Sequence, residues 1–149
     1  MKSIIRTILL MALCMCSGVG IHADQQSNFY KTLTSKDYFT KMNKDEKIRV
    51  MVFTLTECIP CGKAKATIIP GLTKKYAANA NVEVYTVDSD NDVAYNGKSL
   101  TNSFAYVSNS RPLFTVVYHN DVMFFHGGFS LKEISTLENE IDAAIKNIH

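Results

Sequence analysis

Four short apolar segments stand out in the hydrophobic pattern of the chain. They cover residues 48–55, 82–87, 113–118 and 122–126, and each is rich in β-branched or aromatic residues and bounded by polar ones. Such runs are typical of buried strands. Only residues 119–121 separate the last two, a connection short enough for a hairpin. The pattern therefore predicts four strands, of which the last two are antiparallel neighbours.

Two other segments repeat apolar residues at the spacing of an amphipathic helix. The first covers residues 60–78, and Pro70 inside it is expected to kink the helix. The second begins after Ser130, which forms a capping-box sequence with Glu133. The apolar positions are Ala64, Ile68 and Leu72 in the first helix and Leu131, Ile134, Leu137, Ile141, Ile145 and Ile148 in the second.

The order of these elements predicts the fold class. A strand–helix–strand unit is followed by a hairpin and a C-terminal helix, which gives an α/β fold with a mixed sheet of about four to five strands flanked by helices. Residues 29–47 are interpreted as one or two short helices that lead into the domain. Residues 88–109 are interpreted as a polar, partly helical connection, or else as an insertion that sets specificity.

The first 23 residues have the three parts of a secretory signal. Lys2 and Arg6 are positively charged, residues 7–16 are apolar, and residues 17–23 are mostly small, with a cleavage point expected after Ala23. The apolar run is shorter than the about 20 residues of a transmembrane helix. The sequence therefore predicts a periplasmic or otherwise secreted protein, attached to a membrane only if the signal stays uncleaved.

Removal of the signal changes both the charge and the cysteine content. The chain of 149 residues has 16 bases and 14 acids, and two of those bases leave with the signal, so the remainder is neutral. A neutral domain lacks the electrostatic basis for binding nucleic acid. Cys58 and Cys61 are then the only cysteines. The expected organisation is a signal peptide (1–23), an N-terminal extension or helix (24–47) and one domain (48–149).

Cys58 and Cys61 stand where the first predicted strand gives way to a helix. The free N–H groups and the dipole of a helix N-terminus favour a thiolate there. We expect Cys58 to be the exposed nucleophile and Cys61, one turn further on, to be the more buried resolving thiol. Pro60 suits the first turn of a helix, and Ile59 and Pro60 would form the rim of the site.

The run VMVFTLTECIPCGKAK, followed by VEVYTVDSD and SRPLFTVVYHNDVMFFHGGFS, resembles the thioredoxin family. The resemblance covers residues 48–148 and implies a thioredoxin-like fold and a thiol–disulfide oxidoreductase that needs no cofactor and no metal. It also implies that a cis peptide bond precedes Pro112, which faces the cysteines, and that Arg111 binds substrate through its backbone. The Arg111 guanidinium would lower the pKa of Cys58. An equally weighted alternative for Arg111 is a solvated surface charge.

Several positions depart from the thioredoxin pattern. Glu57 stands where thioredoxins have tryptophan, and its carboxylate is expected to raise the pKa of Cys58 by repulsion. Val52 stands where thioredoxins have a buried acid; Thr54, Thr56 and Glu57 are the nearby candidates for that proton-transfer role. The Ile-Pro dipeptide contains no histidine, which predicts a pair that is more reducing than strongly oxidising.

The predicted function is thiol–disulfide exchange on cysteine-containing exported proteins, with a redox partner protein that supplies or accepts electrons. One alternative is a thioredoxin-fold binding or chaperone module with a structural Cys58–Cys61 disulfide, although so small a loop gains little stability from a crosslink. The other is a thiol metallochaperone, although His119, His126 and His149 are not spaced as zinc ligands.

Overall fold

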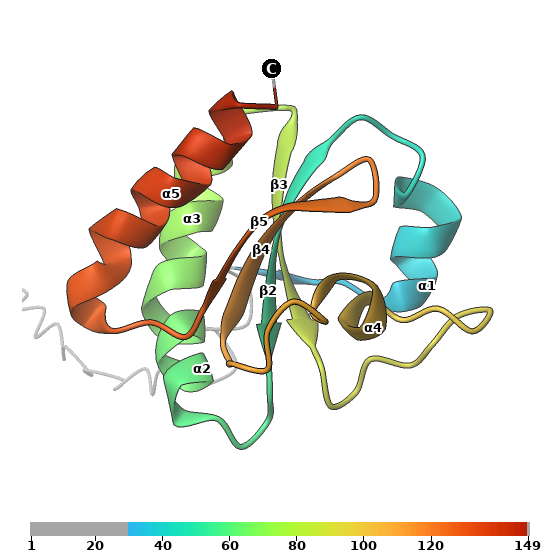
Figure 1. The fold of residues 1–149 in the computed structure, drawn as a ribbon, viewed down its shortest axis with the longest axis horizontal. Helices are drawn as coiled ribbons and strands as arrows, with labels where there is room; N and C mark the ends of the chain where they lie inside the picture. The colour runs from blue at the N-terminus through green and yellow to red at the C-terminus, as the bar shows by residue number, and fades with distance from the viewer. Residues whose placement is uncertain (1–29, 149) are drawn as a thin grey trace, which may run out of the picture.

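The computed structural model describes residues 30–148 and consists of a central sheet with helices on both faces (Figure 1). The predicted signal peptide, residues 1–23, lies outside the described residues, as do residues 24–29 and His149. None of the helices within residues 30–148 is both long and apolar enough to cross a bilayer.

Five strands form one mixed sheet in the order β1-β3-β2-β4-β5. The parallel part consists of β1 (Lys31–Thr32), β3 (Val82–Asp88) and β2 (Ile48–Thr54). The antiparallel part adds β4 (Leu113–Tyr118) and β5 (Asp121–Gly127). The four predicted strands and the mixed α/β sheet are therefore confirmed.

The helices lie on opposite faces of this sheet. Figure 1 shows α2, α3 and α5 on one side and α1 and α4 on the other. A π-helical turn follows α1, a second one joins α2 to α3, and a short 3₁₀ helix leads into α5. Their bounds are α1 (Ser35–Asp37), π turn (Tyr38–Met42), α2 (Ile59–Lys63), π turn (Ala64–Ile68), α3 (Ile69–Tyr76), α4 (Leu100–Phe104), 3₁₀ helix (Leu131–Glu133) and α5 (Ile134–Lys146).

The helical run predicted over residues 60–78 is present, and its irregularity falls directly before Pro70. The N–H of Ile69 donates to the carbonyl of Ala64, five residues back, instead of the usual four. Pro70 has no N–H, and its ring clashes with the carbonyl four residues earlier in a regular α-helix. The wider π turn therefore lies where the α-helical hydrogen bonds cannot continue.

Two hydrophobic clusters, one on each face of the sheet, hold the layers together. Every residue of β2 is buried, and its side chains alternate between the clusters. Val50 and Val52 pack in the cluster beneath α3 and α5, with Leu72, Ile141 and their neighbours. Met51 and Phe53 belong to the other cluster, whose further members are Leu33, Tyr38, Tyr85, Val87, Leu100, Phe104, Ala105, Leu113 and Val117.

The edge strand β1 differs from the sequence prediction. Residues 24–47 were expected to form an N-terminal extension or helix, but from Tyr30 onward this segment contributes a strand to the sheet before α1. It also buries Leu33 and Tyr38 in the second cluster. A strand of two residues is too short to show the alternation by which strands are recognised.

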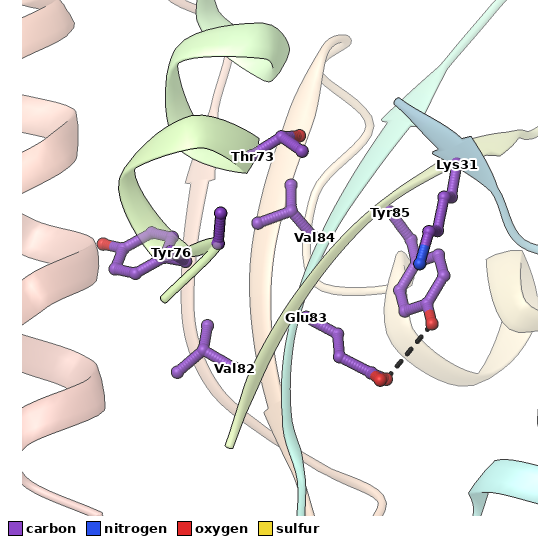
Figure 2. A pocket seen from close by; sticks show the side chains of 8 residues that line it. Lys31, Thr73, Tyr76, Val82, Glu83, Val84 and Tyr85 are labelled. Carbon is purple, nitrogen blue, oxygen red and sulfur yellow. Dashed lines mark hydrogen bonds between the residues drawn. The ribbon is translucent and has the colours of Figure 1, made fainter. Parts of the chain in front are cut away.

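Because β1 is short, it covers only part of the neighbouring strand. Among residues 30–148, β1 pairs with Tyr85 and Thr86 of β3. Figure 2 shows Lys31 and Tyr85 on one side of β3, and Val82 and Val84 on the other. A cavity of about 290 Å³ lies beside the first half of β3, from Val82 to Tyr85, and its lining includes Lys31 and Tyr76.

The connection between β3 and β4 is partly helical, as predicted. Within the described residues of this connection, α4 is the one helix, and the rest has no regular structure. Asp92 holds the start of α4 by accepting the Thr101 N–H at 2.7 Å. The same carboxylate accepts the hydroxyl of Ser35, whose oxygen accepts the Leu100 N–H at 2.8 Å. The two hydrogen bonds of Ser35 thus join this connection to α1. That the segment sets specificity stays a prediction.

Asp142 joins α5 to α3, and its contacts generate a pH prediction. Its oxygens accept the Lys75 ammonium and the Tyr76 hydroxyl, each at 2.5 Å. Burial acts to raise the pKa of Asp142, but these two bonds outweigh it and hold the pKa below its ordinary value. Because the folded state lowers this pKa, the stabilisation is present above about pH 4 and is lost as the pH falls.

We therefore expect Asp142→Asn to lower the free energy of unfolding at pH 7 by about 1 kcal/mol or less, since the ion pair is partly exposed. The difference from the wild type should shrink as the pH falls to about 3, because the stabilisation is lost as the carboxylate becomes protonated. Urea denaturation at both pH values measures it. Asp121→Asn is the control, because Asp121 is exposed and has no ion pair within residues 30–148. An equal loss at both pH values would contradict the electrostatic explanation.

Candidate active site

The two cysteines lie just beyond the buried end of β2. The strand ends at Thr54, and after a short loop Cys58 is the N-cap of α2. The two sulfur atoms form a disulfide with an S–S distance of 2.09 Å. Cys58 is partly exposed, whereas Cys61 is 0% exposed. The structure thus has the difference in burial that the sequence indicated, with Cys58 as the accessible sulfur.

Two backbone groups of opposite polarity lie near the sulfur of Cys58. The Cys61 N–H donates to Cys58 Sγ at 3.2 Å, as expected at a helix N-terminus. The carbonyl oxygen of Arg111 lies 3.8 Å from the same sulfur. In the reduced protein, the N–H favours a thiolate, and the carbonyl oxygen favours a protonated thiol.

The segment before β4 carries Arg111 and Pro112, and it brings the Arg111 carbonyl to Cys58. The peptide bond between them is cis, as the resemblance implied, and Pro112 is buried. The Arg111 guanidinium donates from Nη1 to the carbonyls of Ser108 at 2.8 Å and Ser110 at 2.9 Å. Burial lowers the pKa of Arg111. The guanidinium therefore binds its own loop, a contact that neither interpretation of Arg111 included.

Sequence reasoning missed the residues that support this loop. The Gly128 N–H donates to the carbonyl of Pro112 at 2.7 Å. A Cβ atom on Gly127 would lie 2.8 Å from Ser108 Oγ and 2.9 Å from the Cβ of Ser110. The end of β5 and the loop before Pro112 thus approach each other too closely for a side chain. Gly127 and Gly128 follow the last apolar run in the sequence, and nothing in that local pattern points to the loop before Pro112.

The loop between β2 and α2 is tied to the end of β3. The Ser89 N–H donates to the Thr54 carbonyl at 2.9 Å, and the Thr56 N–H donates to the carboxylate of Asp90 at 2.7 Å. Asp90 was not predicted to have a role, because nothing in the sequence places it beside Thr56. It fixes the backbone two residues before Cys58.

Glu57, which was predicted to raise the pKa of Cys58, and the candidates for the proton-transfer role differ in exposure. Glu57 is exposed and directly precedes Cys58, so its effect on the thiol stays a prediction. Thr56 is also exposed, whereas Thr54 is fully buried with its hydroxyl 3.4 Å from the Val87 carbonyl oxygen. Val52 is fully buried in the cluster beneath α3. That position therefore offers no proton acceptor to the cysteines.

The two residues predicted to form the rim are exposed, and two of the histidines contact residues away from the cysteines. Ile59 is 79% exposed and Pro60 is exposed beside it. His126 pairs with Glu140 at 3.1 Å, and His119 stacks on Tyr118. Within residues 30–148, no three His, Cys, Asp or Glu side chains gather as ligands for a metal ion.

Solved thioredoxin structures match about three quarters of the chain. The germline-specific thioredoxin Deadhead from Drosophila melanogaster aligns with a TM-score of 0.55 and 23% identity, over 74% of this chain and 97% of that one. The chain has a thioredoxin-like fold. Oxidized mitochondrial thioredoxin 3 from Saccharomyces cerevisiae gives 0.56 and 20%, over 79% and 98%. Thioredoxin f2 from Chlamydomonas reinhardtii gives 0.53 and 15%, over 75% and 95%.

At sequence identities this low, the structural matches show the fold of the chain alone. Its activity has to be inferred from the chemistry of the site. No protein-family model and no curated protein sequence matches the chain. The thioredoxin-like fold carries a C-x-x-C disulfide at the start of its first long helix, opposite the cis bond before Pro112.

The close approach at Gly127 predicts a destabilised variant. We expect Gly127→Ala to lower the free energy of unfolding by about 1–3 kcal/mol, because the added methyl group displaces Ser108 and Ser110. Urea denaturation measures the change. Adding Ser110→Gly to this variant removes the clashing Cβ atom and should recover part of the loss.

Gly71→Ala is the matched control. Gly71 lies within α3, and a Cβ there meets nothing within 4 Å. We expect this variant to gain about 0.5–1 kcal/mol, since alanine is the better helix former. A Gly127→Ala protein as stable as the wild type would show that the loop before Pro112 has room to move.

Proposed function

We propose that this protein is a thiol–disulfide oxidoreductase acting on cysteine-containing exported proteins. The observation that carries the proposal is the disulfide at a helix N-terminus, with Cys58 partly exposed and Cys61 fully buried. Only the Cys58 sulfur can then react with a sulfur of another protein, whether it attacks that sulfur or is attacked by it. The export signal proposed for residues 1–23 makes exported proteins the accessible substrates.

In the reducing direction, the Cys58 thiolate attacks one sulfur of a substrate disulfide. The substrate disulfide breaks, its other sulfur leaves as a thiolate that takes up a proton, and a mixed disulfide forms with Cys58. Cys61 then loses its proton and attacks Cys58 Sγ, which releases the second substrate thiol and restores the Cys58–Cys61 disulfide. Two electrons pass to the substrate, and a redox partner protein supplies two more, which reduce the Cys58–Cys61 disulfide again.

The segment before β4 suits a substrate chain bound beside the disulfide. Within residues 30–148, no backbone hydrogen bond engages the N–H or the carbonyl of Arg111, and that carbonyl oxygen is 3.8 Å from Cys58 Sγ. An extended substrate chain next to its reacting cysteine can pair with these groups. Ile59 and Pro60 supply an exposed apolar rim for the same substrate.

The test of the two cysteine roles uses full-length protein in which Cys14 and Cys16 are replaced by serine. We expect Cys58→Ser to abolish exchange with a peptide disulfide, because the remaining cysteine is fully buried. Cys61→Ser should accumulate the mixed disulfide, because nothing then resolves it. Non-reducing electrophoresis and mass spectrometry distinguish the two variants.

Three outcomes would contradict the assignment. Mixed disulfides that accumulate in Cys58→Ser would exchange the roles of the cysteines. A pair that resists dithiothreitol and exchanges with nothing would favour a structural disulfide in a binding module. Stoichiometric metal bound by the reduced protein would favour a metallochaperone instead.

The direction of electron flow gives a separate prediction. The Ile-Pro dipeptide has no histidine to stabilise a thiolate, so we expect a reduction potential near or below about −230 mV. Equilibration of the pair with a dithiothreitol or glutathione series, followed by alkylation, measures it. A potential near about −120 mV would make the protein an oxidant and contradict the reducing direction.

A further inference from the structure

A cavity beside the redox pair has a basic lining. Its volume is about 380 Å³, and Pro60 and Lys63 of α2 form one wall. Phe129, Ser130 and Lys132, from the segment that joins β5 to α5, form the other. Pro60 directly precedes Cys61, so the cavity lies next to the disulfide. Two lysines from different elements therefore meet at the edge of the site.

Both lysines have free charges. Lys63 and Lys132 are exposed, and neither takes part in an ion pair among the residues that the structure describes. One acid, Glu133, is adjacent to Lys132 in sequence. Its carboxylate accepts the Ser130 N–H at 2.9 Å in the capping box and is thus engaged at the helix start. The cavity has amines and apolar surface to offer a ligand.

The other side of Cys58 has the opposite charge. Glu57 is exposed immediately before it, and the carboxylate of Asp90 holds the Thr56 N–H. Asp88 ends β3 in register with Thr54. Figure 1 shows α2 on one side of the end of β2 and the segment that follows β3 on the other. A substrate bound at Cys58 therefore lies between a basic side and an acidic side.

We propose that Lys63 and Lys132 select substrates with a carboxylate side chain close to the reacting cysteine. The inference rests on the proposed exchange activity and specifies its substrate class. The carboxylate enters the cavity and pairs with the two ammonium groups, while its methylene groups contact Phe129 and Pro60. Glu57 and Asp90 repel the same carboxylate on the other side of Cys58, so the charges also set the direction in which the substrate chain lies.

The experiment compares three disulfide peptides that differ only in the residues flanking the cysteine: glutamate, glutamine or lysine. The full-length protein, with Cys14 and Cys16 replaced by serine, is reduced, and its rate constant with each peptide is measured. We expect the glutamate peptide to react about ten times faster than the lysine peptide at low ionic strength, and the ratio to shrink in salt, because exposed charges are screened.

Charge reversal tests the two residues directly. Lys63→Glu/Lys132→Glu should make the lysine peptide the faster substrate, a gain that a misfolded protein does not produce. Lys74→Glu is the matched control: Lys74 is exposed on α3 and has no ion pair in residues 30–148, so its reversal should leave the glutamate preference intact.

The outcomes separate this inference from the proposed function. Equal rate constants for the three peptides overturn the selection by charge and leave the exchange activity standing. An inverted preference in Lys74→Glu as well overturns the role of the cavity, because net charge alone then explains the selection. No exchange with any peptide overturns the proposed function and this inference with it.

Discussion

Burial of β2 on both faces is the constraint on which the rest of the structure depends. It is the central strand, with β3 and β4 as its neighbours, and every one of its residues is buried. Even the charged Arg49 is inside, where Asp45 pairs with its guanidinium at 2.5 Å and the ring of Tyr38 lies below it. A buried charge is costly unless it is paired in this way. The strand ends where the chain becomes polar, and that end places Cys58 at the surface.

The position of the cysteine pair then depends on contacts between segments that are distant in sequence. Asp90, which follows β3, holds the loop before Cys58 through Thr56. Gly128, at the end of β5, holds the carbonyl of Pro112. The Arg111 guanidinium closes the loop that carries both residues of the cis bond. The supports thus come from the ends of β3 and β5 and from the loop before β4, which the sheet brings together.

A feature of this fold could be predicted from the sequence when the residues that indicate it are close together along the chain. This holds for the apolar runs of β2 and β3, for the hairpin and for the cysteine pair. Each of them spans only a few residues, so hydrophobic pattern and spacing were sufficient to predict it. The strand β1 was missed because two residues carry no periodicity. The contact of Gly127 with Ser108 and the bond from Asp90 to Thr56 join positions that only the folded sheet brings together. The cavity between Lys63 and Lys132 was unpredictable for the same reason.

Burial and one hydrogen bond explain why the two sulfurs are not equivalent. A thiolate on Cys61 would be fully desolvated, and Val52, fully buried on the face of β2 that α2 and α3 cover, provides no polar group to stabilise it or to take its proton. Cys58 is partly exposed and has the Cys61 N–H at 3.2 Å. The negative charge of a reduced pair therefore belongs on Cys58. The Arg111 carbonyl oxygen at 3.8 Å opposes this N–H, so the Cys58 thiolate is favoured less than the helix start alone would favour it.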